Sequence, residues 1–174
     1  MTDNSLVVRL CEPADTPLLV PLIQAQVAAT GRPAPDPDAL AEIVNALLVS
    51  QFSDFLLAEK GGRSIGVLQI NYRLSTWELG AYAVIEDFYL APGARGQGVG
   101  TRMLDYACAR AEGRGAQFIQ AAVRPDDRAA RRLYEAFSFT ASQHDLWHAN
   151  LPLGCAADLD APAATDESEA RPEP

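Results

Sequence analysis

The sequence has few cysteines and no long hydrophobic run, and both absences narrow the class of protein. Its 174 residues include only three cysteines, Cys11, Cys108 and Cys155, which are far apart and odd in number. Without a CxxC pair or a histidine at ligand spacing, the pattern predicts neither a disulfide framework nor a zinc site. No stretch approaches the roughly 20 apolar residues of a membrane helix, and no basic and apolar leader opens the chain. We therefore expect a cytoplasmic protein with no membrane partner.

Positive charge is also scarce. The chain has 14 Lys and Arg against 23 Asp and Glu, a formal net charge of -9. Nucleic-acid binding usually depends on clustered Lys and Arg that release counterions, so nucleic acid is not an expected partner. A cationic small molecule fits this charge better, although many soluble proteins are acidic for solubility alone. Assembly as a homodimer is left open.

The length of the chain suits one domain with one hydrophobic core. Apolar periodicity, a proline cluster and the paired glycines 61 and 62 predict alternating strands and helices. The expected strands lie near residues 6–10, 55–59, 64–72, 81–90, 118–123 and 142–148. The expected helices lie near residues 12–29, 38–50, 99–113 and 126–136. Residues 1–153 are thus predicted to form the domain, and the acidic, Ala/Pro-rich tail 154–174 is predicted to be disordered.

A glycine-rich loop lies between the predicted strand 81–90 and the predicted helix 99–113. It consists of Arg95, Gly96, Gln97, Gly98, Val99 and Gly100. Glycines let backbone N–H groups approach an anion, and the dipole of the following helix, with the Thr101 hydroxyl, favours negative charge. The spacing fits neither the dinucleotide fingerprint nor the P-loop, which needs a lysine after its glycines. The loop therefore predicts a phosphate pocket, with a flexible connector as the alternative that the loop alone leaves open.

Two segments, IEDFYLAPGARGQGVGTRML and RAARRLYEAFSF, resemble the signature segments of the GNAT superfamily of acetyl-CoA-dependent N-acetyltransferases. The resemblance covers roughly Val84 to Phe139. It implies an α/β (α+β) fold with a mixed, mostly antiparallel central sheet of about six to seven strands, flanked by about four helices. It also implies acetyl transfer from acetyl-CoA to a small-molecule primary amine, without a metal ion. The phrase from Ile85 to Tyr89 is similar to the polyamine and thialysine branch, which points to a di- or polyamine or an amino-acid side chain.

The resemblance also implies roles for single residues. An alkylamine is protonated at neutral pH, so the reaction needs a proton acceptor. The family pattern implies Glu86 as this general base and Tyr134 as the acid that protonates the CoA thiolate. It implies the backbone N–H of Leu90 as the oxyanion donor, at an irregularity where this strand stops pairing with the next strand. The residues implied to bind acetyl-CoA are Phe88, Tyr89, Leu90, Arg95, Gly96, Gln97, Gly98, Val99, Gly100, Thr101, Asp127, Ala130 and Tyr134.

These residues also have plainer interpretations. A lone glutamate on a strand is usually a solvated surface residue, and a tyrosine beside Leu133 usually packs in a core. Asp87 follows Glu86 and is expected on the opposite face of a regular strand, so the two should not act as one pair. Three further aromatic residues fit either an amine pocket or the core: Trp77, Tyr82 and Trp147.

The sequence departs from the family pattern at two places, and two other functions stay open. Asp127 stands where the family often has asparagine, and Ser138-Phe139 stands where many members have Gly-Phe. One alternative is a CoA-binding module without turnover, although the presence of both Glu86 and Tyr134 argues against it. The other is a protein or aminoacyl N-acetyltransferase, which the acidic charge disfavours.

Overall fold

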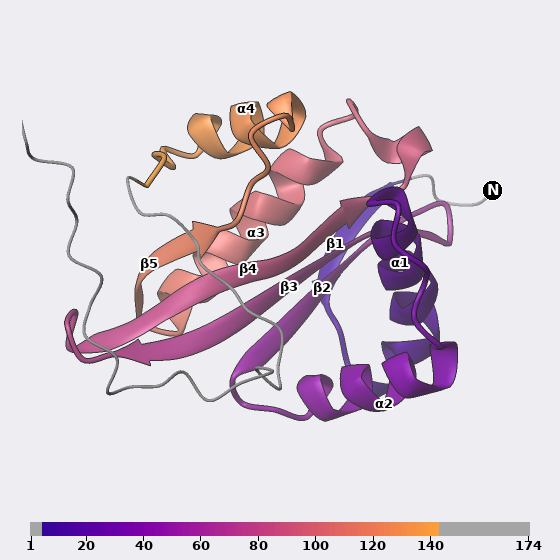
Figure 1. Cartoon of the computed structure of the whole chain (residues 1–174), viewed down its shortest axis with the longest axis horizontal. Coiled ribbons are helices and arrows are strands. Elements are labelled where there is room, and N and C mark those ends of the chain that lie inside the picture. Colours follow the sequence, from indigo (N-terminus) through magenta and orange to yellow (C-terminus); the bar gives the residue numbers. More distant parts are fainter. Residues whose placement is uncertain (1–4, 143–174) are drawn as a thin grey trace, which may run out of the picture. The chain divides into compact units, whose positions relative to one another are not determined.

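The computed structural model describes residues 5–142, and the elements in this range follow the predicted order (Figure 1). The strands are β1 (Leu6–Leu10), β2 (Ser53–Lys60), β3 (Arg63–Ser75), β4 (Gly80–Leu90) and β5 (Ala116–Ala121). The α-helices are α1 (Thr16–Ala29), α2 (Pro37–Leu48), α3 (Val99–Gly113) and α4 (Arg128–Ala136). Short 3₁₀ turns, η1 (Pro13–Asp15) and η2 (Pro92–Ala94), precede α1 and the glycine-rich loop. The predicted strand 142–148, apart from its first residue, lies outside the described residues, as do Trp147, Cys155 and the tail 154–174.

The strands form one mixed sheet in the order β1-β2-β3-β4-β5. Strands β1 to β4 are antiparallel neighbours, and the turn between β2 and β3 falls at the paired glycines as predicted. Strand β5 runs parallel to β4 because the intervening α3 carries the chain back along the sheet. The predicted fold class is confirmed, while the described residues contain five strands instead of six to seven.

Helices cover both faces of this sheet (Figure 1). Helices α1 and α2 pack on one face, where Leu19 and Val44 belong to a core cluster with Phe55 of β2. Helix α3 packs on the other face, where Met103 and Leu104 belong to a second cluster. Residues 55–58 of β2 are all buried, because a strand covered on both faces has no side that meets water.

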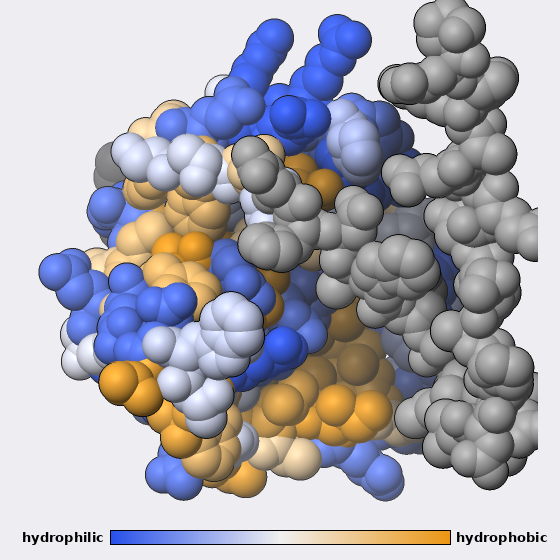
Figure 2. Space-filling view, turned by 60° about the vertical axis from the view of Figure 1, so that its left-hand side comes forward, coloured by the Kyte–Doolittle hydropathy of each residue, from blue (hydrophilic) through white to orange (hydrophobic). Residues whose placement is uncertain are grey.

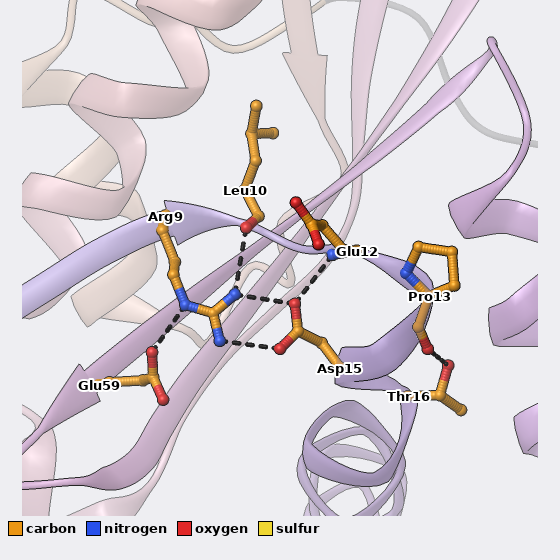
Figure 3. A network of polar contacts seen from close by, with 7 residues as sticks. All are labelled: Arg9, Leu10, Glu12, Pro13, Asp15, Thr16 and Glu59. Carbon is orange, nitrogen blue, oxygen red and sulfur yellow. Dashed lines mark hydrogen bonds and ion pairs between the residues drawn. The ribbon is translucent and has the colours of Figure 1, made fainter.

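An arginine-centred network joins β1, β2 and the start of α1 (Figure 3). Two guanidinium nitrogens of Arg9 donate to the Asp15 carboxylate, each at 2.8 Å, and Nε donates to Glu59 at 2.8 Å. The Asp15 carboxylate also accepts from the backbone N–H of Glu12, the N-cap residue of η1, at 2.8 Å. The hydrogen bonds from Arg9 hold the pKa of Asp15 below its usual range, although burial acts in the opposite direction.

The substitution Asp15→Asn is expected to destabilise the fold by about 1–3 kcal/mol at neutral pH, because it removes charge-assisted hydrogen bonds from a mostly buried carboxylate. The folded pKa of Asp15 is depressed, so its contribution is present above the unfolded pKa of about 3.9 and is lost as the pH falls through the folded value. Urea unfolding of parent and variant should therefore show a difference that shrinks below about pH 4.

The matched control is Asp126→Asn. Asp126 pairs with Arg124 at 2.7 Å, but the two side chains are 70% and 69% exposed. Water and salt screen such a pair, so no measurable change in stability is expected. An equal loss in both variants, or a loss for Asp15→Asn that does not depend on pH, would contradict the role given to Asp15.

Candidate active site

Strand β4 contains an irregularity at the position of the predicted base. In the ladder with β3, Asp87 lies opposite Gln69, while Ile85 lies opposite Ile70. Two consecutive residues of β3 thus face residues of β4 that are two apart, so Glu86 is the extra residue of a β-bulge. The expectation of a regular strand at this point is wrong.

The bulge changes the face on which the following side chains lie. Ile85, Phe88 and Leu90 all pack in the core cluster on the α3 face, whereas Tyr89 packs in the cluster on the α1 and α2 face. On a regular strand Ile85 would share its face with Tyr89, because side chains alternate with a period of two. The extra residue therefore turns Phe88 and Leu90 toward the side of the sheet that carries the glycine-rich loop and α4.

Beyond the bulge, β4 has no strand neighbour on one side among residues 5–142. Strand β5 pairs with β4 only from Ala81 to Ile85, because β5 ends at Ala121. Strand β4 continues to Leu90. The expected divergence of β4 from the next strand exists, but it begins after Ile85 and not at Leu90.

The backbone groups at this edge can be assigned from the ladder. The N–H of Ala91 donates to the carbonyl oxygen of Ile65 on the β3 side at 2.9 Å. In a strand, the backbone N–H and C=O groups of successive residues point alternately to the two neighbouring strands. Because Ala91 points toward β3, so does Tyr89, whereas Phe88 and Leu90 point away from β3. The N–H groups of Phe88 and Leu90 have no strand partner within residues 5–142. The N–H of Tyr89 points toward β3 and is not a donor at this edge.

The glycine-rich loop leads directly into α3. Gly96 and Gly98 have φ values of 70° and 77°, which L side chains rarely adopt, and an added Cβ at either would meet open space. Gly98 is the N-cap residue and has no side chain to cap the helix. The first helical hydrogen bond runs from the N–H of Arg102 to the carbonyl of Gly98 at 3.1 Å. Three N–H groups therefore lack an intrahelical acceptor: those of Val99, Gly100 and Thr101.

Side chains brace this loop from two directions. Gln97 donates to the carbonyl of Gly93 at 2.6 Å and accepts from the ammonium of Lys60 at 3.0 Å. The Nε of Arg95 donates to the carbonyl of Leu90 at 3.1 Å. Lys60, in the hairpin between β2 and β3, adds positive charge beside the loop. Sequence reasoning missed Lys60 because nothing in the spacing shows that this hairpin reaches the loop.

A cavity of about 190 Å³ lies beside the free edge of β4. Residues of α1, β4, the segment after β5, and α4 line it. Among them are the predicted site residues Glu86, Phe88, Asp127, Ala130 and Tyr134. The structure therefore brings the predicted base and the predicted acid to one cavity. Leu90 and the loop residues Arg95 to Thr101 do not line it.

Tyr134 is a core residue that also faces this cavity. Its side chain is buried, and its ring lies 5.0 Å from that of Phe139 and 6.5 Å, edge to face, from that of Phe88. Within the described residues its hydroxyl has no hydrogen-bond partner. Burial raises the pKa of Tyr134, so the phenol keeps its proton at neutral pH and can donate it.

Glu86 is half-exposed and forms an ion pair with Arg73. Its carboxylate lies 3.8 Å from a guanidinium nitrogen of Arg73, and the side chains are 46% and 50% exposed. An ion pair of this length and exposure is weak, so it leaves the carboxylate accessible. Sequence reasoning did not single out Arg73, because its approach depends on the pairing of β3 with β4.

The two aspartates near the site have separate partners. The Asp127 carboxylate accepts from the backbone N–H of Ala130 at 2.9 Å, and so caps α4. The Asp87 carboxylate accepts from Nε2 of Gln26 on α1 at 2.9 Å. Burial is the main factor that raises the pKa of Asp87. Asp87 is not among the described residues that line the cavity, although its partner Gln26 is.

The aromatic residues considered for an amine pocket lie elsewhere. Trp77 is 94% exposed in the turn between β3 and β4, so it is neither in the pocket nor in the core. Tyr82 stacks on Phe118 of β5 with ring centroids 4.9 Å apart. Figure 2, which brings the left-hand side of Figure 1 forward, shows hydrophobic residues (orange) interspersed with hydrophilic ones (blue) on this surface. Within residues 5–142, neither Trp77 nor Tyr82 lines the cavity beside β4.

Three further observations concern residues 5–142. They contain no group of three or more His, Cys, Asp or Glu side chains placed to hold a metal ion. No helix in this range is long and apolar enough to cross a membrane. Cys11 and Cys108 are free thiols, and burial raises the pKa of Cys11 to about 12.

Comparison with known proteins identifies the family. The profile of the acetyltransferase (GNAT) family matches residues 22–139. The uncharacterized N-acetyltransferase YhfO of Bacillus subtilis (strain 168) is 29% identical over 128 residues, which cover 74% of this chain and 85% of YhfO. The chain therefore belongs to the GNAT acetyltransferase family and is an acetyl-CoA-dependent N-acetyltransferase.

Solved structures share the fold. A predicted acetyltransferase from Clostridium acetobutylicum, crystallised with acetyl-CoA, has a TM-score of 0.72 and 22% identity, covering 83% of this chain and 96% of that one. The integron cassette protein HFX_CASS3, from the mobile metagenome of the Cole Harbour Salt Marsh, has a TM-score of 0.75 and 24% identity. The match covers 83% of this chain and 90% of the cassette protein. At these identities the likeness concerns the fold.

The substitution Gly98→Glu is expected to abolish the rise in melting temperature that CoA produces in the parent protein. A carboxylate and its side chain would occupy the open space before α3 and repel an anion there. The measurement is a thermal melt with and without CoA.

Gly115→Glu is the matched control for this experiment. Gly115 has the same φ of 77°, an added Cβ there also meets open space, and it follows the opposite end of α3. Both variants carry the same backbone strain, so only the loop variant should lose the CoA effect. If Gly98→Glu folds and responds to CoA as the parent does, the loop does not bind the pyrophosphate.

Proposed function

We propose that this acetyltransferase transfers the acetyl group of acetyl-CoA directly to a small primary amine, with Glu86 as general base and Tyr134 as general acid. One observation carries the proposal: the two side chains, far apart in the sequence, line a single cavity beside the free edge of β4. The Glu86 side chain is accessible, and burial raises the pKa of the Tyr134 phenol so that it keeps its proton.

The glycine-rich loop is the proposed site of the CoA pyrophosphate. Three N–H groups without intrahelical acceptors, the positive end of α3 and the Lys60 ammonium all favour an anion at this point. Arg95 and Gln97 contribute by holding the loop in shape through their bonds to Leu90 and Gly93. The side chains absent at Gly96 and Gly98 leave the space that the phosphates need.

The pantetheine arm is proposed to run along the free edge of β4, where its amides replace the missing strand. Phe88 and Leu90 offer unpaired N–H groups there. Leu90 was expected to supply the oxyanion donor. Of Phe88 and Leu90, however, it is Phe88 that lines the cavity together with Glu86 and Tyr134. We therefore assign the Phe88 N–H to the thioester oxygen and the Leu90 N–H to the arm.

The chemistry follows from these positions. Glu86 takes the proton of the bound ammonium and passes it to solvent, and the nitrogen lone pair then forms a bond to the thioester carbon. As the tetrahedral intermediate collapses, the nitrogen loses a second proton, which Glu86 again passes to solvent. The negative charge that develops on oxygen is stabilised by a fixed N–H donor on β4. The carbon–sulfur bond then breaks, and Tyr134 gives its proton to the departing thiolate. Solvent restores the proton of Tyr134.

Two substitutions should separate these roles. Glu86→Gln and Tyr134→Phe are each expected to lower kcat about 10²–10⁴-fold. The Glu86→Gln deficit should shrink as the pH rises, because more amine arrives already neutral, whereas the Tyr134→Phe deficit should not. The measurement is CoA-thiol release over a range of pH, with CoA affinity determined in parallel.

Neighbouring residues provide controls for both substitutions. Glu135→Gln changes an exposed carboxylate next to Tyr134, and Tyr106→Phe removes a hydroxyl from a half-buried tyrosine of α3. Neither should alter kcat by more than about twofold, since surface and non-site changes have small effects. Parental kcat/KM in Glu86→Gln across neutral pH would show that Glu86 is only a surface carboxylate.

The amine is proposed to be cationic beyond its reacting nitrogen, as in a diamine, polyamine or amino-acid side chain. Glu86 and Asp87 are adjacent carboxylates, and the chain carries a formal net charge of -9. The kcat/KM for a diamine should therefore fall with added salt more steeply than that for an amine with a neutral tail. Equal activity and equal salt dependence for the two amines would show that the enzyme does not prefer an acceptor with a second positive charge.

A further inference from the structure

The hairpin of β3 and β4 ends in a turn that exposes large apolar side chains. Leu74, Trp77 and Leu79 are 82%, 94% and 86% exposed, the highest values among the large apolar residues that the structure describes. The turn lies beyond the neighbouring strands, since β2 pairs with β3 only up to Asn71 and β5 pairs with β4 only from Ala81 onward (Figure 1). Apolar side chains gathered at one exposed place mark a surface that contacts another molecule.

The backbone of this turn is strained as well. Leu79 has a φ of 52°, in the left-handed region that residues with a side chain rarely adopt. Its side chain is mostly exposed, so packing within the described residues does little to offset this strain. Strained backbone of this kind is concentrated at functional and binding surfaces. The turn therefore has two independent features of a contact surface.

A second cavity, also of about 190 Å³, lies beside the base of the same hairpin turn. Its walls include Phe52, Tyr72, Leu74 and Ala81, and none of the residues that line it also lines the cavity at Glu86. Phe52 and Leu74 are 55% and 82% exposed, so this second cavity opens to solvent and a side chain of another molecule can enter it. Apolar and aromatic walls suit an aromatic side chain.

The turn and the second cavity carry opposite charges. Glu78 follows Trp77, is exposed, and forms no ion pair within residues 5–142. Arg73 and Arg114 line the cavity, and no acidic residue is among the described residues that line it. Arg73 is half-exposed, and its 3.8 Å pair with Glu86 is weak. The cavity thus suits an aromatic side chain with a carboxylate beside it, which is what the turn presents.

We propose that two copies of this chain form a symmetric dimer in which Trp77 of each copy enters the second cavity of the other, with Glu78 beside Arg73 of the partner subunit. Trp77 does not line the second cavity of its own chain. One molecule carries both the protruding side chain and the cavity, so a two-fold axis between two hairpins forms both contacts at once. The turn precedes β4 and the glycine-rich loop follows it, so the contact lies away from the proposed CoA site. The proposal is independent of the chemistry proposed for the first cavity.

The first test measures the oligomeric state of the full chain by sedimentation over a range of concentrations. The parent should dimerise, and Trp77→Ser should weaken dimerisation at least about a hundredfold, because interface tryptophans are often hot spots and the symmetric contact loses two of them. Ile43→Ser is the matched control: Ile43 is 58% exposed on α2 and does not line the second cavity. The control should keep the parental dissociation constant. A cooperative thermal melt confirms that each variant is folded.

A mixing experiment tests whether the contact is reciprocal. Ala81→Leu enlarges a wall of the second cavity and should prevent dimerisation while Trp77 stays in place. A mixture of Trp77→Ser and Ala81→Leu can still form one complete contact, in which the tryptophan of one variant enters the open cavity of the other. Heterodimers should therefore form in the mixture, although each variant alone is monomeric. Should Ala81→Leu not fold, Phe52→Ala, which removes an exposed wall of the same cavity, takes its place.

Exchange of charges tests the proposed pair of Glu78 with Arg73. Glu78→Arg and Arg73→Glu should each weaken dimerisation at least about tenfold, because each brings like charges together across the interface. The double variant Arg73→Glu/Glu78→Arg restores opposite charges and should recover most of the parental affinity. Losses that add in the double variant would overturn this pair.

Several outcomes would overturn the dimer itself. A parent that is monomeric at every concentration, a dimer that Trp77→Ser leaves unchanged, or an equal loss in Ile43→Ser would each do so. A mixture of the two variants that stays monomeric would show that Trp77 does not enter the second cavity. Trp147 is the only other tryptophan of the sequence, so Trp147→Phe makes the fluorescence specific for Trp77. A monomer that shields Trp77 from an aqueous quencher would give this surface an occupant other than a second copy.

Discussion

The active site depends on one feature of the backbone, the extra residue in β4 at Glu86. A single insertion in one strand of an antiparallel pair shifts every later side chain to the other face. Here it places Phe88 and Leu90 on the α3 face with Ile85. It also comes directly after the last residue of β4 that pairs with β5. The bulge therefore coincides with the point where the backbone donors of β4 become available.

An unpaired strand edge next to a helix N-terminus is an unusual combination in a folded core, because both carry unsatisfied N–H groups. In this chain the two features adjoin, since β4 ends at Leu90 and α3 begins at Val99. Donors on the edge suit the amides and carbonyl of an extended thioester, and donors at the helix suit its phosphates. The same short stretch of chain thus supplies both halves of the proposed acetyl-CoA site. Helix α1, held on the other face by the cluster around Leu19, brings Gln26 to the cavity.

Much of the fold could be predicted from the sequence, because local patterns carry it. The glycine-rich loop, the helix 99–113 and the hairpin at the paired glycines follow from turn chemistry and periodicity, and the structure contains all three. Glu86 and Tyr134 were predicted from resemblance, and they line one cavity. Their chemical roles remain proposals.

The rest depends on pairing between distant segments, which a single sequence does not reveal. The bulge was missed because it exists only relative to the register of β3. The end of β4–β5 pairing was expected at Leu90 and lies at Ile85, because it depends on the length of β5, which the sequence of β4 does not show. Gln26, Lys60 and Arg73 were missed because tertiary contacts alone bring them to the site. Trp77 was considered for a pocket on chemistry, but its turn carries it into solvent.

Amide hydrogen exchange along β4, followed with and without CoA, tests whether the free edge of β4 binds the cofactor. The N–H groups of Phe88 and Leu90 should exchange fast in the free protein and become protected when CoA binds. The N–H groups of Tyr89 and Ala91, which face β3, should be protected in both states. If Phe88 and Leu90 are already protected without CoA, or stay unprotected when it is bound, β4 does not present a free edge to the cofactor and the account is wrong.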